Sequence, residues 1–400
     1  MSVGPGPASS RTLAEITPIP AGAPLLVLNA GSTGLKASLH DGEGLCLWRG
    51  QRSWQELGGA PGRDGRAPQA GWPRLAAWLE GGLQAWAETR RVSGGDGPVS
   101  PALVGHRVVH GGERFTAPTP LGGAELAALE ALIPLAPLHN PPALALIRWA
   151  QAHWPGVPQW ACFDTAFHAS LPPEAFTYAI PASWRHEGLR RFGFHGLNHQ
   201  HLAQVVAKRF RPATTDGPLR LISCHLGGGC SLCAIEAGRS IATTMGFTPL
   251  EGLVMATRSG SLDPGLLLHQ LRRGHDLAEL ERALQQEGGL LGLSQLSAEM
   301  RELRAAAAPP PAGHGHPGAA LAIAVFRRRL LEGIGAMAAC LRGVDVIALS
   351  GGIGEHDQAL RRELEVELAW LAPFELVVVP ADEEGVIARS CLAAAGQSGC

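Results

Sequence analysis

Arginine, histidine and aspartate residues that could do chemistry gather in a few short segments of this 400-residue sequence. Arg107 lies in GHRVVHGGERF, Asp164 in CFDTAFH and His195 in RRFGFHGLNHQH. His139 lies in APLHNPP, before a predicted turn that is stiffened by proline. Each segment alone is weak evidence, because a single histidine among apolar residues is usually a hydrogen-bonded core side chain. Together with Arg258 in ATRSG they suggest a site for anions, because an arginine fork binds carboxylate and phosphoryl oxygens bidentately.

Two strand-turn-strand segments are expected to position such a site. LLVLNAGSTGLKASLHDGEG and LISCHLGGGCSLCAIEAGRS each contain a buried strand, a glycine-rich turn and a second strand. A shift of 196 residues places His225 against Asn29 and Gly227 against Gly31, a match of pattern more than of identity. We expect a duplicated domain whose copies open with a hairpin that can approach a phosphate. Two coincidental hairpins are the alternative.

The remaining pattern alternates amphipathic helices with short β-rich runs, which is typical of an α/β fold with sheets covered by helices. The run from Ala305 to Gly318 is predicted to be a surface loop. The β-rich runs are LVGHRVVH, VDVIALS and FELVVVP, and the predicted helices are Gly123 to Leu132, His199 to Phe210, Pro264 to Arg273, Leu277 to Gln286 and Ala319 to Leu341.

Composition and charge exclude several classes of protein. With 33 Lys+Arg against 35 Asp+Glu, the formal charge of -2 provides no field that would attract nucleic acid or anionic lipid. The most apolar stretch, Leu321 to Leu341, is interrupted by charges, so no membrane helix is expected. The first residues lack a secretory signal pattern, and Cys224 and Cys340 are expected to be reduced core thiols. We therefore expect a cytoplasmic protein without nucleic-acid or membrane partners.

Three common binding motifs can also be set aside. The sequence has only two lysines, Lys36 and Lys208, and neither follows a glycine, so a P-loop NTPase is excluded. Cys230 and Cys233 form a CxxC on a predicted strand, where positions three apart face opposite sides, so we do not expect them to share a metal. The HGH at 314–316 is expected to be solvated loop.

The ordered set of motifs resembles the acetate kinase family across essentially the whole chain after residue 24. The matching segments are NAGSTGLK, GHRVVHGGERF, APLHNPP, FDTAFH, GFHG, CHLGGG, TMGFTPLEGLVMATRSG, GLLGLSQLSAEMR and SGGIGEH. The resemblance implies the fold that acetate and sugar kinases share with actin and Hsp70. This α/β fold has two duplicated actin-like (ribonuclease H-like) domains and an active-site cleft between them.

The family reaction transfers the γ-phosphoryl group of ATP reversibly to acetate, giving acetyl phosphate and ADP. A carboxylic acid with a pKa of about 4–5 is already ionised at neutral pH, so the site must chiefly position and neutralise two anions. By resemblance, Arg107 holds the acyl or phosphoryl group, Arg258 and His195 stabilise the transition state, and His139 assists. Asp164 matches the family's catalytic acidic residue and would orient an arginine or Mg²⁺. The alternative is that Asp164 has no catalytic role and forms a buried ion pair with a nearby arginine.

The resemblance also implies a metal and a nucleotide site. Asn29 and Glu383 match the family's Mg²⁺ contacts, with Glu384 adjacent and Mn²⁺ as the alternative ion. For Lys36, which matches a position that contacts ATP in the family, the alternative is a solvated side chain without such a role. The nucleotide-binding residues implied are Ser32, Lys36, His225, Leu226, Gly227, Gly228, Gly229, Glu299, Met300, Arg301, Gly352, Ile353, Gly354, Glu355 and His356.

The acyl pocket implied by the resemblance is lined by Val109, Leu138, Phe194 and Pro249. Acetate is the expected acid, and propionate is expected to be a poorer but real substrate because one methylene changes binding by only about 1–3 kcal/mol. A kinase for a sugar would need a base and a polar pocket instead of these four apolar residues.

Four positions depart from the family pattern. Gly34, Gly228, Glu299 and His356 replace Ser, Asn, Asp and Asn, and all four are expected on the nucleotide side. They leave open a non-catalytic, nucleotide-binding protein with the actin-like fold as the alternative function.

The expected organisation is a disordered tail at 1–23, an N-terminal domain at 24–165 plus 383–400, and a C-terminal, nucleotide-side domain at 166–382. The resemblance implies a homodimer with acetate and ATP as small-molecule substrates.

Overall fold

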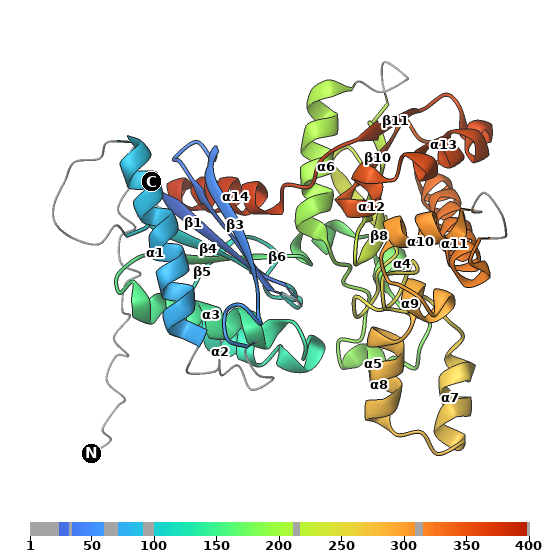
Figure 1. The fold of residues 1–400 in the computed structure, drawn as a ribbon, viewed down its shortest axis with the longest axis horizontal. Coiled ribbons are helices and arrows are strands. Elements are labelled where there is room, and N and C mark those ends of the chain that lie inside the picture. Colours follow the sequence, from blue (N-terminus) through green and yellow to red (C-terminus); the bar gives the residue numbers. More distant parts are fainter. Residues whose placement is uncertain are drawn as a thin grey trace, which may run out of the picture.

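A computed structural model describes residues 24–31, 34–59, 71–90, 100–210, 217–308 and 315–397. Within these ranges the chain forms two lobes, each built around one mixed β-sheet (Figure 1). The first sheet has 6 strands and the second has 5. The predicted α/β class with two similarly built halves is confirmed, while the predicted tail at 1–23 lies outside the described residues.

The first sheet follows the order β3-β2-β1-β4-β6-β5 and is covered on both faces. Leu26 and Leu28 pack with helices α1 and α3, whereas Leu25 and Val27, which alternate with them, pack with α14. The elements are β1 (Leu25–Ala30), β2 (Gly34–His40), β3 (Cys46–Ser53), α1 (Gly71–Arg90), β4 (Leu103–Val108), β5 (Thr119–Pro120), α2 (Gly123–Glu130), α3 (Asn140–His153), β6 (Gln159–Phe163) and α14 (Glu383–Gln397).

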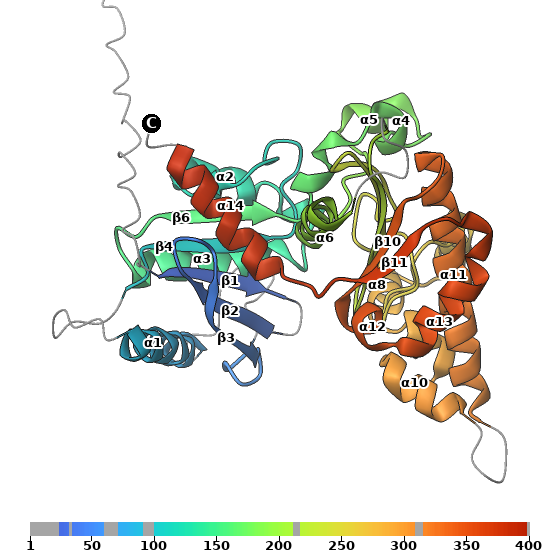
Figure 2. The same ribbon diagram turned by 90° about the horizontal axis from the view of Figure 1, so that it is seen from above.

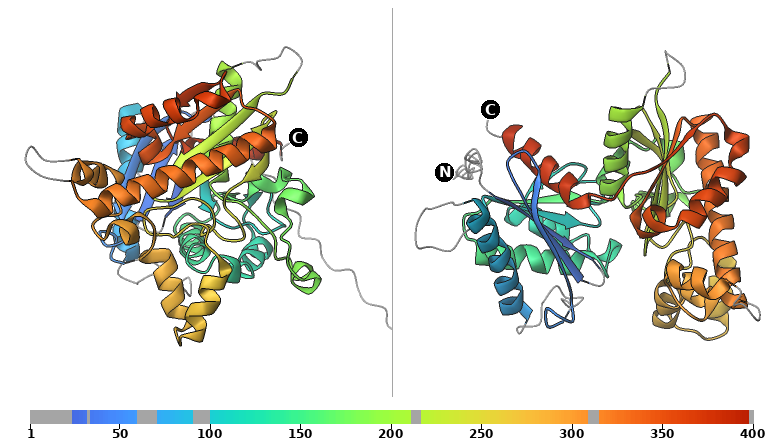
Figure 3. Two further views of the ribbon diagram at one scale, coloured as in Figure 1. Left: turned by 90° about the vertical axis from the view of Figure 1, so that its right-hand side faces the viewer. Right: turned by 45° about the horizontal axis from the view of Figure 1, so that its top comes forward.

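The second sheet follows the order β11-β10-β7-β8-β9. Helix α6 covers one face and the long α11 covers the other, as Figure 3 shows. Cys230 and Cys233 belong to the cores on opposite faces of β8, as predicted. The elements are α6 (Gly196–Arg209), β7 (Arg220–Leu226), β8 (Cys230–Glu236), β9 (Arg239–Thr243), α11 (Pro317–Leu341), β10 (Val346–Ser350) and β11 (Glu375–Val378).

The two predicted hairpins are present and occupy equivalent places in the two sheets. In each sheet the first hairpin strand pairs antiparallel with the second and parallel with a later strand, β1 with β4 and β7 with β10. Both turns are tight, since Gly31 N donates to Gly34 O at 2.8 Å and Gly227 N donates to Gly229 O at 3.0 Å. The duplication predicted from the repeat is therefore found in the backbone.

The chain crosses between the lobes twice. It leaves the first lobe after β6 and returns at its end, where α14 lies along the first sheet (Figure 2). The shorter helices surround the second sheet and the passage between the lobes. They are η1 (Ile133–Leu135), η2 (Ala166–Ser170), α4 (Pro173–Phe176), α5 (Ala182–His186), α7 (Pro264–Arg272), α8 (Leu277–Gln286), α9 (Gly289–Ser294), α10 (Met300–Ala307), α12 (Gly351–His356), α13 (Gln358–Glu367) and η3 (Ala369–Leu371).

Three predictions were wrong. The prolines after His139 were predicted to stiffen a turn but open helix α3, where proline suits the first turn because its missing N–H has no helical partner. The predicted loop Ala305 to Gly318 overlaps two helices at its ends, because α10 runs to Ala307 and α11 begins at Pro317. Cys340 is exposed on α11 instead of buried, whereas Cys224 is buried. No helix within the described ranges is long and apolar enough to cross a membrane.

Candidate active site

A cavity of about 280 Å³ lies between the two lobes, beside the turns of both hairpins. It collects side chains from β1, β4, α3 and α14 of the first lobe together with the region around α6, β7 and β8. All residues predicted to be catalytic, to hold the metal or to line the acyl pocket face this one cavity: Asn29, Arg107, Val109, Leu138, His139, Asp164, Phe194, His195, Pro249, Arg258 and Glu383.

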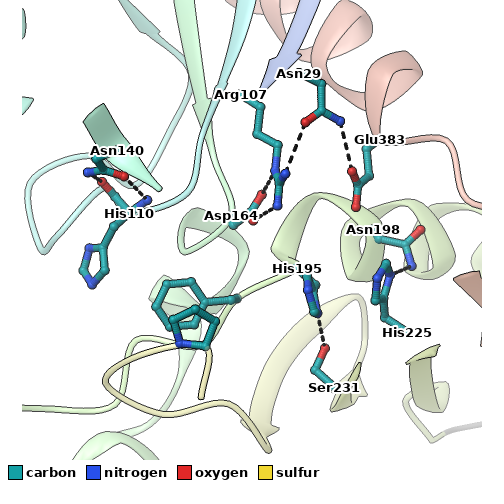
Figure 4. A network of polar contacts seen from close by, with 12 residues as sticks. Asn29, Arg107, His110, Asn140, Asp164, His195, Asn198, His225, Ser231 and Glu383 are labelled. Carbon is teal, nitrogen blue, oxygen red and sulfur yellow. Dashed lines mark hydrogen bonds and ion pairs between the residues drawn. The ribbon is translucent and has the colours of Figure 1, made fainter. Parts of the chain in front are cut away.

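Arg107 and Asp164 form a bidentate ion pair at the ends of the parallel strands β4 and β6. The Arg107 Nε donates to Asp164 Oδ1 at 2.9 Å and Nη2 donates to Oδ2 at 2.5 Å, while Nη1 donates to Asn29 Oδ1 at 3.2 Å (Figure 4). Burial alone would lower the pKa of Arg107, but the charges of Asp164 and Glu383 outweigh it and raise that pKa. Burial raises the pKa of Asp164, and the bonds from Arg107 oppose that rise. Asp164 is therefore already engaged as an acceptor.

The carboxylates at the start of α14 meet Asn29 on β1. The Asn29 amide nitrogen donates to Glu383 at 3.2 Å and to Glu384 at 2.7 Å. Burial would raise the pKa of Glu383, but the charge of Arg107 outweighs that rise and Lys36 adds to the lowering, so the carboxylate stays ionised in its half-buried place. No group of three or more His, Cys, Asp or Glu ligands occurs in the described part of the chain. An amide oxygen and an ionised carboxylate fit Mg²⁺, which keeps waters and uses few protein ligands.

Arg258 reaches the cavity from the second lobe without an acidic partner. Its Nη1 donates to the Pro249 carbonyl at 2.7 Å, and among the described residues it forms no ion pair. A Cβ at Gly229 would lie only 2.8 Å from Arg258 Nη2 and 3.0 Å from His195 Nε2, so this glycine lets both side chains reach the cavity. Burial lowers the pKa of Arg258, and Arg107 adds to the effect. The result is an uncompensated cation in a partly closed space.

Three histidines at the site are neutral. Burial, followed by the charges of Arg258 and Arg107, lowers the pKa of His139 to about 4. Burial also lowers the pKa of His195 well below its usual value and the pKa of His225 below its usual value. The rings of His195 and His225 stack with centroids 4.1 Å apart. Neutral imidazoles can donate a hydrogen bond to an anion from one ring nitrogen without carrying charge.

The FHG segment explains how His195 reaches this place. His195 adopts a left-handed backbone, φ 56° and ψ 23°, immediately before α6 begins. Gly196 N donates to Asp164 O at 2.9 Å, and a Cβ on Gly196 would lie 2.1 Å from that same oxygen. Only glycine permits this approach, which brings the start of α6 against the strand end that carries Asp164.

A second cavity of about 510 Å³ lies in the second lobe, beyond the glycine-rich turn of β7 and β8. Arg304 at its edge is fixed by bonds to Asp357 and Glu363. Eight of the predicted nucleotide-binding residues line this cavity: Gly227, Gly228, Glu299, Met300, Arg301, Gly352, Ile353 and His356. Lys36, His225 and Gly229 line the first cavity.

Three predicted nucleotide-binding residues line neither cavity, and a fourth is not described. Leu226 and Gly354 are buried and line neither cavity. The Glu355 carboxylate accepts hydrogen bonds from Gly351 N and Ala381 N, both at 2.9 Å, so it occupies the first backbone N–H of α12. Ser32 lies outside the described residues.

Sequence reasoning missed three residues that line the first cavity, Ala30, Gln51 and Pro142. Gln51 lies on β3 directly opposite Lys36, so a prediction of that strand and its register would have found it. Pro142 is in the first turn of α3, where the sequence predicted a turn stiffened by proline.

Comparison with known proteins decides the family. The sequence matches the Acetokinase family over residues 97–372. The acetate kinase of Synechococcus sp. is 42% identical, with 92% of this chain and 98% of the relative covered. The chain belongs to the acetokinase family. The predicted resemblance is confirmed.

Solved structures agree with this assignment to the acetokinase family. The acetate kinase of Porphyromonas gingivalis superimposes with a TM-score of 0.77 at 28% identity, covering 93% of this chain and 99% of that one. A propionate kinase from Francisella tularensis gives a TM-score of 0.76 at 28% identity, covering 92% and 98%. The four departures from the acetokinase pattern do not all share one place, because Gly228, Glu299 and His356 line the second cavity and Gly34 lines the first.

Proposed function

We propose that this chain is an acetate kinase that reversibly transfers the γ-phosphoryl group of ATP to acetate, giving acetyl phosphate and ADP. The observation that carries the proposal is the pair of arginines at a small cavity. Asp164 neutralises Arg107, whereas Arg258, within the described part of the chain, donates to a carbonyl oxygen and has no acidic partner. A half-buried charge without an ionic partner is costly, so Arg258 indicates that an anion pairs with it during function.

The reaction needs positioning and charge stabilisation more than a base. An acetate oxygen attacks the γ-phosphorus while the bond to the bridging oxygen of ADP breaks, and ADP leaves with that electron pair. Acetate is already ionised, so no proton has to be removed. We assign Arg107 and Arg258 to the acetate and phosphoryl oxygens and His195 and His139 to hydrogen bonds with them. Asp164 orients Arg107, because both of its oxygens accept from that arginine.

The size of the acid is assigned to the apolar wall. Val109 and Phe194 are buried, 5% and 1% exposed, and with Leu138 and Pro249 they line the same cavity as the arginines. Such a wall favours a methyl group next to the bound carboxylate. Propionate should react more slowly, because one methylene changes binding by only about 1–3 kcal/mol.

The metal and nucleotide assignments follow the same division of the site. We assign Mg²⁺, or Mn²⁺ in its place, to Asn29 Oδ1 and Glu383, where the bound ion would neutralise phosphate charge. The glycine-rich turn at 227–229 lies between the two cavities, so its backbone suits the phosphates of ATP and the larger cavity suits the nucleoside.

We also propose the domain division 24–165 plus 383–400 and 166–382, because α14 shares a core with β1 of the first sheet.

A homodimer is proposed from the α7–α8 hairpin, which projects from the second lobe in Figure 1. Helix α7 has no buried residue, and Leu268 and Leu277 are 51% and 78% exposed. We expect the protein to sediment at twice the 41.9 kDa chain mass. Leu268→Glu combined with Leu271→Glu should halve that mass, whereas Leu321→Glu on α11 should not. A wild-type protein that sediments as a single chain would refute the dimer.

The activity is tested by trapping acetyl phosphate with hydroxylamine after incubation with acetate, ATP and Mg²⁺. Arg258→Ala should lower kcat by about 10²–10³-fold, the usual loss when one transition-state donor is removed, with an unchanged circular dichroism spectrum. Arg361→Ala, at an exposed pair with Glu365, is the control and should retain full activity. If the wild-type protein forms no product with ATP, GTP or pyrophosphate, the alternative of a non-catalytic nucleotide-binding protein takes over.

A further inference from the structure

Behind His195 the structure contains a buried row of alternating serine and histidine side chains. His195 Nδ1 lies 2.8 Å from Ser231 Oγ, and the same oxygen lies 2.8 Å from His199 Nε2. On its other side, His199 Nδ1 lies 2.8 Å from Ser223 Oγ. Ser223, His199 and Ser231 are all fully buried, and His195 is 8% exposed. None of the first three lines the cavity.

The elements bring this row together through simple periodicities. His195 and His199 are four residues apart, so they lie on one side of α6 where it begins. Ser223 and Ser231 come from the neighbouring strands β7 and β8, with Ser231 paired to His225. The far end of the row is the His195 Nε2, which faces the cavity together with Arg258 across Gly229.

Both imidazoles in the row are neutral, since burial lowers the pKa of His195 and of His199 well below the usual value. A neutral imidazole has one N–H and one accepting nitrogen. A serine has a single hydroxyl proton, so Ser231 donates to one of its two histidines and accepts from the other. The hydrogen bonds along the row can therefore be arranged in two ways, with donation running either from Ser223 toward His195 or from His195 toward Ser223.

Ser223 selects between them. Within the described ranges its hydroxyl has one hydrogen-bond partner, His199 Nδ1. If His199 Nδ1 carried the proton, the Ser223 hydroxyl proton would be buried without an acceptor, at a cost of about 1–3 kcal/mol. If Ser223 donates instead, His199 donates from Nε2 to Ser231, and Ser231 donates to His195 Nδ1. Every proton then has an acceptor, and the His195 proton is left on Nε2.

We infer that His199 and Ser231 are positioning residues that hold His195 as its Nε2–H tautomer, so that the ring donates a hydrogen bond to the phosphoryl group in the cavity. The part that concerns the phosphoryl group rests on the proposed function, whereas the tautomer does not. His225 is held in the same way, since Asn198 Nδ2 donates to its Nδ1 at 2.8 Å and leaves Nε2 protonated (Figure 4).

The test compares tautomer and turnover in matched variants of the full chain. Histidine ¹⁵N NMR reports which ring nitrogen is protonated, and His195→Asn assigns the signal. In the wild type we expect His195 protonated on Nε2. Ser231→Ala removes the hydroxyl between the two histidines and should give a mixture of His195 tautomers. We expect kcat for acetyl phosphate to fall by at least about tenfold, which is less than the 10²–10³-fold loss expected when a hydrogen-bond donor is removed completely. The KM for acetate should stay within about twofold, because the apolar wall is untouched.

Two further variants separate positioning from packing. His199→Leu should repeat the loss, whereas His199→Gln should retain most turnover, because its amide can donate to Ser231 and accept from Ser223. Ser38→Ala is the control, because Ser38 is also a buried serine whose Oγ lies 2.8 Å from a histidine nitrogen, His40 Nε2. This variant should change neither the ¹⁵N signal of His195 nor kcat. Should His199→Leu fail to fold, Ser231→Ala decides.

A wild-type His195 protonated on Nδ1, or a Ser231→Ala protein that keeps the Nε2–H signal, would overturn the inference. Because the spectra need no substrate, they decide the tautomer even if the protein makes no acetyl phosphate.

Discussion

Two glycines that replace larger residues of the family pattern have different physical reasons. A Cβ on Gly34 would lie 2.2 Å from the Arg52 carbonyl oxygen on β3, so the backbone of the neighbouring strand occupies the space of a side chain. A Cβ on Gly228 meets nothing within 4 Å. Gly34 is thus required by this chain's own packing, whereas Gly228 leaves room at the edge of the nucleotide-side cavity.

This contrast gives a paired prediction. Gly228→Asn should fold normally and lower the KM for ATP about two- to tenfold, because one added hydrogen bond contributes about 0.5–1.5 kcal/mol. Gly34→Ser should lower the melting temperature and the yield of folded protein, because β2 and β3 must separate. Steady-state kinetics and thermal unfolding measure the two effects. A stable Gly34→Ser protein, or an unchanged KM in Gly228→Asn, would contradict the reading of these positions.

The residues at the site were largely predictable from sequence, because chemistry of this kind needs distinctive side chains. Arg107, Asp164, His195 and Arg258 were singled out by type and motif, and all face one cavity. Ser231 was not, because a serine in a predicted strand carries no visible signal. Its role depends on a distance of 2.8 Å to a histidine 32 residues away.

At the scale of elements, the segment from 243 to 251 is held by a latch that we define as Tyr178, Arg191 and Glu251. The Tyr178 hydroxyl donates to Glu251 at 2.6 Å and accepts from Phe247 N at 2.9 Å. Arg191 donates to the carbonyls of residues 243–245 and, at 2.6 Å, to Glu251. The segment carries Pro249, so the latch sets the position of one wall of the acyl pocket.

Tyr178→Phe should loosen that wall. We expect the KM for acetate to rise and the ratio of kcat/KM for propionate over acetate to increase several-fold, because a bond to a charged acceptor contributes about 1.5–3 kcal/mol. The kinetics of both acids, measured side by side, test this. Equal KM and an unchanged ratio in the variant would mean that the core alone fixes Pro249.

Elements with a clear period or a turn signal were predicted well, and the others were not. Helix α8 begins and ends at the predicted residues, and α7 ends within one residue of its prediction. Helix α3 was missed because its Asn-Pro-Pro start resembles a turn, and β3 was missed because its residues alternate irregularly between partly buried and exposed. Local signals do not distinguish a proline that opens a helix from one that ends a turn.

At the scale of the whole molecule, the duplicated hairpins face one cavity from two lobes. The last helix, α14, returns Glu383 to Asn29 across 354 positions of sequence. The repeat alone predicted two similar halves. It did not predict that both halves and the end of the chain would meet at one polar network, because that depends on packing between distant segments.

The buried histidines make the stability of the whole fold depend on pH. Burial lowers the pKa of His106 and His168 to about 4, whereas an unfolded histidine titrates near pH 6.5. Above pH 6.5 both states are neutral and the fold is at full stability. As pH falls from 6.5 toward 4 the unfolded chain takes up protons first, so each such histidine lowers the free energy of unfolding by roughly 1.4 kcal/mol per pH unit.

We therefore expect the urea concentration at the midpoint of unfolding to decrease clearly as the pH is lowered from 7.5 to 5. Carboxylates contribute little in this range because they titrate near pH 4. His106→Phe should weaken this pH dependence by the amount that corresponds to one proton taken up on unfolding, because phenylalanine fills the same buried place without a titrating group. Urea titrations at several pH values measure both slopes. A midpoint that stays constant over this window would mean that these histidines are protonated in the folded protein, which their burial argues against.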